Sequence, residues 1–305
     1  MLKQLLLPIL LVVSSISIAQ VASQDQLEHY TQEWQGERFE DGRPKVSDAI
    51  LARMKNISIE EAWGTLRNKG FHNQFAGNWM ILHPGQAMVG RALTVQYMPN
   101  RPDYAKRMIE QGHADGRIGS MNSWPIDMLV DGDVYVADCF GKVVDGTLIG
   151  DNLGNSIYAK SRNGVVFDGG SRDLAGLQKI EGFNAWVKGW DPSFLQETMV
   201  SGINHPIRIG RAVVFPGDVV LAKEEGVIFI PAHLAETVVI NAEFIMLRDE
   251  FGITRLKEGV YTPGQIDTRW TEEIKSDFLE WLAKNPDKLP MSRAELDAYL
   301  KDRNW

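Results

Sequence analysis

The stretch that decides the fold is IGDNLGNSIYAKSRNGVVFDGGSRDLAG, residues 149–176. It places a Gly-Asp pair ahead of one helical pattern and a Gly-Gly-Ser-Arg-Asp run ahead of the next, with an apolar run between them. This pattern predicts a helix over 151–162, a buried strand over 164–167 and a second helix over 173–180. Such alternation is typical of an α/β domain with a parallel sheet. Because ligands bind such sheets where strands end and helices begin, the same stretch is a candidate site.

The second half of this stretch suits the binding of an anion. Backbone amides at a helix start attract negative charge, and Gly169 and Gly170 would let a ligand approach closely. Arg172 has donors that match a carboxylate or an enolate oxygen. Asp173 supplies a hard oxygen ligand of the kind that Mg²⁺ or Mn²⁺ prefers.

The first half repeats this arrangement around Gly150. Asp151 stands at a predicted helix start, and the amides of Asn152 and Leu153 follow directly. Two helix starts aimed at one point would hold a carboxylate close to Arg172 and a metal ion. The combination favours metal-assisted enolisation, because an anion that develops there is stabilised.

Helix capping alone also explains these aspartates. An Asp at the N-cap stabilises a helix by about 1 kcal/mol without any further function. An adjacent Arg-Asp pair often makes only surface contacts, and motifs of this composition are weak signals. From the spacing alone, a capping role and an active site both remain open.

The rest of the chain predicts one core domain with two extensions. Residues 20–43 are polar and form an N-terminal arm, and a turn-rich linker, YTPGQID, leads to a helical extension over 263–305. Between them, DGDVYVADCFG (131–141) and PGDVVLAKEEG (216–226) share a pattern in which a Gly-Asp turn feeds an apolar strand and then a second turn. Capping patterns at Ser58/Glu61 and Ser292/Glu295 predict two helix starts.

Composition narrows the class of protein. The chain has 305 residues and a net charge of −8, so it lacks the basic excess usual in nucleic-acid binders. Cys139 is the only cysteine, so no intrachain disulfide can form, and its place after a strand-like run predicts a buried, inert thiol.

The first 19 residues, MLKQLLLPILLVVSSISIA, have the pattern of a secretory signal. Lys3 precedes an apolar run over 5–13, and small residues follow at Ser17 and Ala19. We expect cleavage after Ala19 and export to the periplasm or the medium. The alternative is an uncleaved membrane anchor, although the apolar run is shorter than the ~20 residues that a spanning helix needs.

Several ordered motifs resemble the RraA-like family, which includes class II 4-hydroxy-4-methyl-2-oxoglutarate (HMG) aldolases and regulators of ribonuclease E. The family motif is an aspartate, twenty residues and then Arg-Asp, and residues 152–171 separate Asp151 from Arg172-Asp173 here. Other matching pieces cover roughly residues 44–262: VSDA (46–49), VGRALTV (89–95), GDVYVAD (132–138), GVVFDGGSRDLAG (164–176) and FPGDVVLAKEEGVIFIP (215–231).

The resemblance implies a single α/β core domain of the swivelling β/β/α type that assembles as a homotrimer or homohexamer. It also implies roles for the motif residues. Asp173 would bind Mg²⁺ or Mn²⁺, Arg172 would stabilise a pyruvate enolate, and Asp151 would position a metal-bound water for proton transfer. The substrate carboxylate would rest on the Gly150 turn, held by the amides of Asn152 and Leu153.

In aldolase members a glutamate from the neighbouring subunit completes the site. Glu250, in the helix after the last core strand, is the best match, and Glu243 is the alternative.

The resemblance favours a metal-dependent aldolase or decarboxylase acting on a small 2-oxo acid, a carbon–carbon lyase. Two alternatives remain open. One is a non-catalytic regulator that acts by protein contact, and the other is a lyase or isomerase of sugar-acid derivatives.

Overall fold

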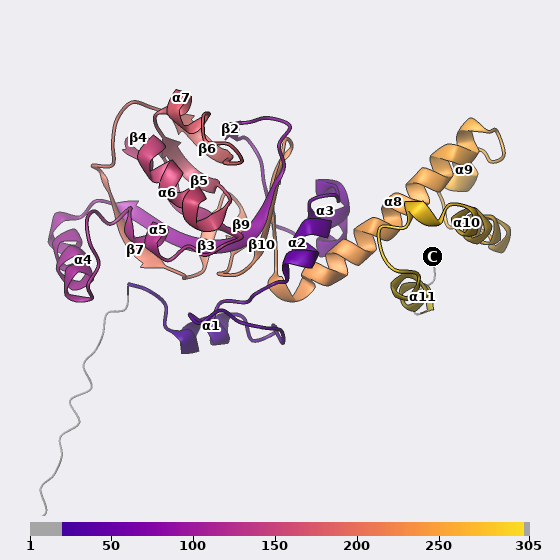
Figure 1. Ribbon diagram of the computed structural model, residues 1–305, viewed down its shortest axis with the longest axis horizontal. Coiled ribbons are helices and arrows are strands. Elements are labelled where there is room, and N and C mark those ends of the chain that lie inside the picture. Colours follow the sequence, from indigo (N-terminus) through magenta and orange to yellow (C-terminus); the bar gives the residue numbers. More distant parts are fainter. Residues whose placement is uncertain (1–19, 302–305) are drawn as a thin grey trace, which may run out of the picture.

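A mixed sheet of nine strands forms the centre of the computed structural model, which describes residues 20–301 (Figure 1). The strands follow the order β1-β11-β10-β3-β4-β5-β6-β2, and β7 also pairs with β3. The predicted α/β class and helical extension are confirmed. The sheet strands are β1 (Phe75–Ala76), β2 (Met80–Ile81), β3 (Met88–Pro99), β4 (Asp133–Thr147), β5 (Val165–Ser171), β6 (Ala185–Trp190), β7 (Thr198–Ile203), β10 (Val219–Lys223) and β11 (Gly226–Ile230); β8 (Ile207–Ile209) and β9 (Ala212–Val214) form a separate hairpin.

Four neighbouring strands at the centre, β3 to β6, are parallel to one another. Tyr135 and Phe167 point to one face of the sheet and pack in one core cluster, whereas Val136 and Val166 point to the other face and pack in another. Burial on both faces explains why the run over 165–167 is continuously apolar. All four strands end at the same edge of the sheet, and the turns at Gly150 and Arg172 lie side by side at this edge.

The helices that pack on the sheet lie on one of its faces, whereas the β8–β9 hairpin covers the other face. Trp124, Ile157 and Leu177 bring α5, α6 and α7 onto this face over the parallel strands, and α2, α3 and the start of α8 pack on the same face over β10 and β11. The helices are α1 (Gln24–Tyr30), α2 (Asp48–Met54), α3 (Ile59–Asn68), α4 (Pro102–Ala114), α5 (Trp124–Asp127), α6 (Asp151–Ser161), α7 (Leu174–Leu177), α8 (Ala235–Lys257), α9 (Pro263–Ile266), α10 (Glu272–Lys284) and α11 (Arg293–Lys301), with 3₁₀ turns η1 (Ala232–Leu234) and η2 (Pro286–Lys288).

Several local predictions match these elements. Ser58 and Glu61 form the expected capping box at the start of α3, and Ser292 and Glu295 bond reciprocally before α11. Gly132 and Gly217 both adopt a positive φ ahead of their strands, as expected for the two Gly-Asp turns. Cys139 is buried, and burial raises the pKa of its thiol to about 12, so the thiol is inert at neutral pH.

Two elements differ in length from their predictions. The second helix of the deciding stretch is the single turn α7, because residues after Leu177 form consecutive tight turns rather than continuing the helix. β4 continues to Thr147 where a turn was expected at Gly141. Its pairing with β5 shifts register twice after Asp138, which marks an irregular strand that bends rather than ends.

The N-terminal arm is more ordered than its polar composition suggests. α1 begins with a capping box formed by Ser23 and Gln26, and Leu27 is fully buried. Arg43 is also buried and pairs with Asp133 of β4 at 3.1 Å. The arm is therefore packed onto the core near both of its ends.

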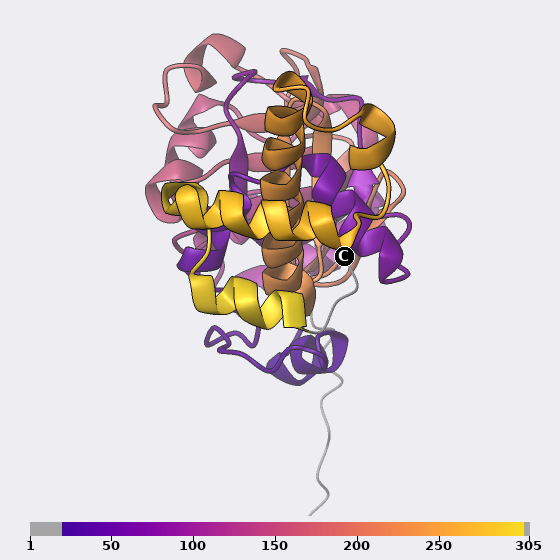
Figure 2. The same ribbon diagram turned by 90° about the vertical axis from the view of Figure 1, so that its right-hand side faces the viewer.

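The C-terminal extension is built around α8, which leads away from the sheet (Figure 1). Figure 2 shows α10 and α11 lying across this helix. Phe244 and Phe251 of α8 pack against Phe278 and Trp281 of α10 in a separate aromatic core. Within residues 20–301, no helix combines the length and apolar character needed to span a bilayer.

Candidate active site

The candidate site lies where β4 and β5 end, and hydrogen bonds hold the two chain segments side by side. The Leu148 amide donates to the Gly170 carbonyl, and the Arg172 amide donates to the Ile149 carbonyl, both at 3.0 Å. The Ser171 hydroxyl also donates to the Ile149 carbonyl at 3.0 Å. These bonds fix Gly150 beside Arg172 and Asp173, which are far from it in sequence.

Gly150 is in direct contact with the side chains of Arg172 and Asp173. A Cβ atom added to Gly150 would lie 2.1 Å from Asp173 Oδ2 and 3.0 Å from Arg172 Nε. Its φ of −119° is accessible to any residue, so glycine is needed here for space and not for backbone conformation. Both side chains therefore lie directly over the turn that starts α6.

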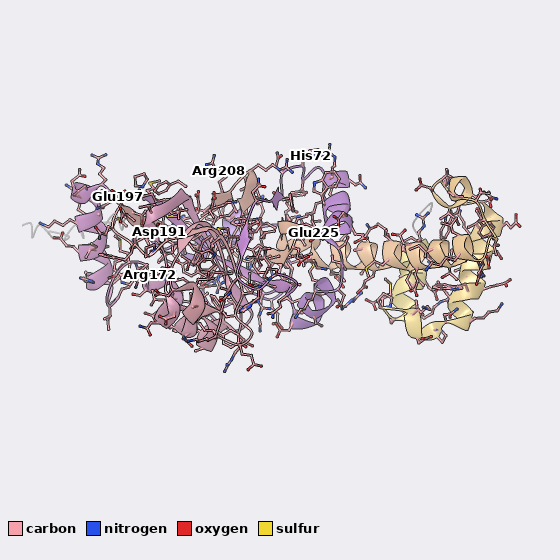
Figure 3. All side chains as sticks on the ribbon, turned by 90° about the horizontal axis from the view of Figure 1, so that it is seen from above. His72, Arg172, Asp191, Glu197, Arg208 and Glu225 are labelled. Carbon is pink, nitrogen blue, oxygen red and sulfur yellow. The ribbon has the colours of Figure 1, made fainter. Side chains whose placement is uncertain are left out.

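Arg172 and Asp173 form a loose pair at the surface of a single chain. Arg172 Nε lies 3.6 Å from Asp173 Oδ2, and the two side chains are 40% and 44% exposed. Figure 3 shows Arg172 on the sheet part of the molecule, away from the helical extension. Asp173 adopts a left-handed conformation with φ of 57°, which is uncommon outside glycine and occurs at functional sites.

Asp151 faces the same place from α6. A Cβ atom on Gly176 of α7 would lie 2.7 Å from both Cβ and Oδ2 of Asp151. Asp151 therefore packs against the turn that Asp173 begins, while Asp173 packs against the residue before Asp151. This reciprocal arrangement brings all three predicted side chains to one site.

The two amides expected to hold a carboxylate are in different states. The Asn152 amide donates to Asp151 Oδ1 at 2.8 Å, so a ligand would have to displace that carboxylate oxygen. The Leu153 amide belongs to the first turn of α6, where amides have no acceptor within the helix. The start of α6 can bind an anion, whereas α7, with one turn, adds little helix dipole.

The glutamates proposed to complete the site from a neighbouring subunit lie on α8. Within its own chain, Glu250 pairs with Lys288 of the extension. Glu243 is buried and is bound by Arg53 of α2 at 2.6 Å, which gives it a structural partner. A single chain does not test a contact between subunits, so Glu250 stays a prediction.

The donor set is compatible with a divalent metal held by few protein ligands. Over residues 20–301, no group of three or more His, Cys, Asp or Glu side chains has the arrangement of a complete metal cage. Mg²⁺ commonly uses one or two carboxylates and takes its other ligands from water and substrate. Asp173 and Asp151, both accessible to solvent, fit that mode of binding.

The sequence interpretation did not anticipate the role of Gly176. The DLAG ending of the deciding stretch places a residue without a side chain where the Asp151 carboxylate packs. The available signal was the glycine in the first turn of a predicted helix, a position where glycine is unfavourable without a packing reason.

Comparison with known proteins places this geometry in a family. The family model RraA-like, described as Aldolase/RraA, matches residues 44–229, which include Asp151, Arg172 and Asp173. The chain belongs to the RraA-like family. This family includes both aldolases and inhibitors of ribonuclease E, and its members are typically oligomeric.

Two solved structures share the RraA-like fold. An uncharacterized protein from Pseudomonas syringae pv. tomato is 22% identical with a TM-score of 0.61, over 77% of this chain and 99% of that chain. RraAS2 from Streptomyces coelicolor, described as an unusual member of the RNase ES inhibitor RraA protein family, is 23% identical with a TM-score of 0.59, over 69% of this chain and all of that chain. At these identities the likeness concerns the fold. Both proteins are shorter than this RraA-like chain, and the family match ends before α8.

Proposed function

We propose that this RraA-like protein is a metal-dependent carbon–carbon lyase that cleaves or decarboxylates a 2-oxo acid through a pyruvate enolate. The observation that supports this proposal is the convergence of Asp151, Arg172 and Asp173 around Gly150 and Gly176. Capping does not account for these contacts, because Gly150 and not Asp151 is the N-cap of α6, and Asp173, the N-cap of α7, makes no side-chain cap bond.

Arg172 is suited to stabilise the enolate. Its guanidinium is partly exposed and held over Gly150, where a carboxylate on the α6 start would put the neighbouring oxo oxygen within reach. Two N–H donors aimed at one oxygen stabilise negative charge that develops there. A divalent ion held by Asp173, with Asp151 nearby, would supply Lewis-acid polarisation of the same oxygen.

The reaction requires a proton transfer at a defined place. In cleavage of HMG, the C4 hydroxyl loses its proton, the C3–C4 bond breaks, and C3 of the enolate gains a proton, which yields two pyruvate molecules. In decarboxylation of oxaloacetate, CO₂ leaves and C3 gains the proton. We propose that Asp151, which packs on Gly176 three residues after Asp173, orients the water that exchanges this proton.

We also propose that the protein acts as a homo-oligomer. An exposed site of this kind is completed when another subunit covers it, and Glu250 is the proposed contribution. We expect a homotrimer or homohexamer, which light scattering coupled to size-exclusion chromatography would measure. A monomeric but fully active enzyme would contradict the role of Glu250.

We also propose that the chain is exported. The predicted cleavage point after Ala19 lies outside the described residues. Gln20, the expected first residue of the mature chain, is buried, and its side chain donates to the Val200 carbonyl at 3.0 Å. Mass spectrometry of protein from the exported fraction should give a mature chain that begins at Gln20. Intact Met1 in that fraction would favour the uncleaved anchor.

An assay of pyruvate release tests the lyase directly. The purified protein should release pyruvate from HMG or oxaloacetate when Mg²⁺ or Mn²⁺ is added, and EDTA should abolish the activity. Arg172→Ala should reduce kcat by about 10²-fold or more, because it removes the donors that face the developing negative charge. Arg107→Ala, at an exposed position on α4, is the matched control and should retain full activity.

Equal rates of pyruvate release by the wild type and Arg172→Ala would contradict the proposal. Activity only on sugar-acid derivatives, lost in Arg172→Ala, would favour the alternative lyase or isomerase chemistry. Absence of turnover together with a stable protein partner recovered from the exported fraction would favour the regulator.

A further inference from the structure

A second pocket, separate from the candidate active site, lies between the N-terminal arm and the core. Its volume is about 290 Å³, and its lining is mainly apolar. Tyr30 and Trp34 contribute from the arm, Phe71 from the segment after α3, and Phe215 from the turn before β10. The arm residues precede the family match, which begins at residue 44, so the family match alone does not define this pocket.

The aromatic rings of the pocket are held in fixed positions. The Tyr30 and Phe215 rings contact each other with centroids 6.3 Å apart, and Phe71 contacts the His233 ring at 6.2 Å. The Trp34 indole donates to the Glu37 carbonyl at 2.7 Å, which fixes its orientation. A ligand would therefore meet preorganised rings.

The polar groups of the pocket include an uncommitted amide oxygen and one exposed carboxylate. Gln74 uses its NH₂ group to bond the carbonyls of Val213 and Phe229, which leaves its carbonyl oxygen as the acceptor. Asp218 accepts from the Phe215 amide at 2.8 Å, and burial raises the pKa of its carboxyl to about 8, so it adds little negative charge at pH 7. Glu33 adds an exposed carboxylate at the rim.

Positive charge is missing from this lining. Among the described residues that line the pocket there is neither Lys nor Arg. Burial lowers the pKa of His233, although Glu33 partly opposes the shift, so the imidazole is mainly neutral at pH 7. An anionic ligand would find acceptors and a carboxylate but no cation to pair with.

We propose that this pocket binds a small organic cation, an ammonium group on an apolar body of about one ring. Aromatic faces attract ammonium groups through their quadrupole, and the Glu33 carboxylate adds direct charge pairing. The Gln74 carbonyl oxygen and the Glu33 carboxylate match the N–H donors of an amine. The cavity has room for one ring and a short chain, and its binding does not depend on the lyase activity.

Three ligands of nearly equal shape test the proposal by calorimetry with the full chain at pH 7: phenethylammonium, 2-phenylethanol and phenylacetate. Phenethylammonium should bind at least tenfold more tightly than the neutral alcohol, and phenylacetate should bind more weakly than both. Equal affinities, preference for phenylacetate, or no binding of any ligand tighter than about 1 mM would overturn the proposal.

Two variants locate the binding in this pocket. Glu33→Gln, at an exposed rim position, should weaken phenethylammonium binding at least fivefold and leave 2-phenylethanol unchanged. Glu40→Gln removes the same charge from an exposed position of the arm outside the pocket, and it should leave both affinities unchanged. An equal loss in both variants, or none in Glu33→Gln, would assign the binding to general surface charge or to another site.

Discussion

At the scale of single residues, the site depends on positions where a side chain is missing. Gly150 and Gly176 each leave space that a functional carboxylate occupies, and neither requires the left-handed conformation that often explains a glycine. Steric space, rather than backbone freedom, is the reason for glycine at both places.

Gly150→Ala tests this explanation. The added methyl group would displace Asp173 and Arg172, so we expect at least a tenfold loss of kcat/KM in the pyruvate assay with little change in Tm. Gly64→Ala is the control, because a Cβ on that helical residue meets nothing within 4 Å. The control should keep its activity and gain up to about 1 kcal/mol of stability. Full activity in Gly150→Ala would show that Arg172 and Asp173 do not act from this position.

The raised pKa of Asp218 predicts that the stability of the protein depends on pH. Burial raises the pKa of its carboxyl to about 8, whereas an unfolded aspartate titrates near pH ~3.9. Between these values folding takes up a proton, so the contribution of Asp218 to the free energy of unfolding falls as pH rises. Urea unfolding at pH 5 and pH 8 should show a smaller loss of stability in Asp218→Asn than in the wild type. Parallel pH profiles would contradict the raised pKa.

At the scale of elements, one buried ion pair attaches the N-terminal arm to the sheet. Arg43 is 1% exposed and contacts Asp133 at 3.1 Å and Asp41 at 2.7 Å, and its guanidinium stacks over the Phe39 ring. Asp133 is fully buried at the start of β4. The arm is therefore part of the folding unit and also forms one wall of the second pocket.

Arg43→Met should destabilise the protein by about 3–5 kcal/mol in urea unfolding, because it leaves Asp133 buried and unpaired. Adding Asp133→Asn should recover part of that loss. Lys45→Met removes a cation from an exposed pair with Glu37 on the same arm and should cost less than about 1 kcal/mol. Equal small effects of Arg43→Met and Lys45→Met would mean that the arm is not held by this pair.

At the scale of the whole molecule, α8 connects two hydrophobic cores. Its first half packs with α2 and α3 over the sheet, and its second half packs in the aromatic core of the extension. The ion pairs of Arg53 with Glu243 and Glu295 join α2, α8 and α11 at the junction. The extension thus has its own hydrophobic core, and α8 contributes residues to this core and to the core over the sheet.

Ending the chain after Gly259 should leave the sheet folded and release the second half of α8. Phe244 and Phe251 would lose their partners, so we expect dye binding by exposed apolar surface and fast hydrogen exchange over 244–257, with slow exchange retained in β3 to β6. Loss of protection throughout the sheet would instead show that the two cores unfold as one unit.

The sequence by itself determined the α/β alternation, the helix starts at Ser58 and Ser292, and the family motif that joins Asp151 to Arg172-Asp173. These features are local, or are ordered motifs with a fixed spacing, so they can be recognised without coordinates. Helix length was less predictable, because the turns after Leu177 end α7 in spite of its helical pattern.

Only the tertiary structure decided that Asp151 packs on Gly176 and Asp173 on Gly150. It also decided that Arg43 meets Asp133 across ninety residues of chain, and that the arm forms a pocket with Phe215. Such contacts join residues far apart in sequence, and their existence depends on how strands and helices pack. No local pattern of residue types carries that information. The polar composition of the arm therefore did not show that it packs on the core and forms one wall of a pocket.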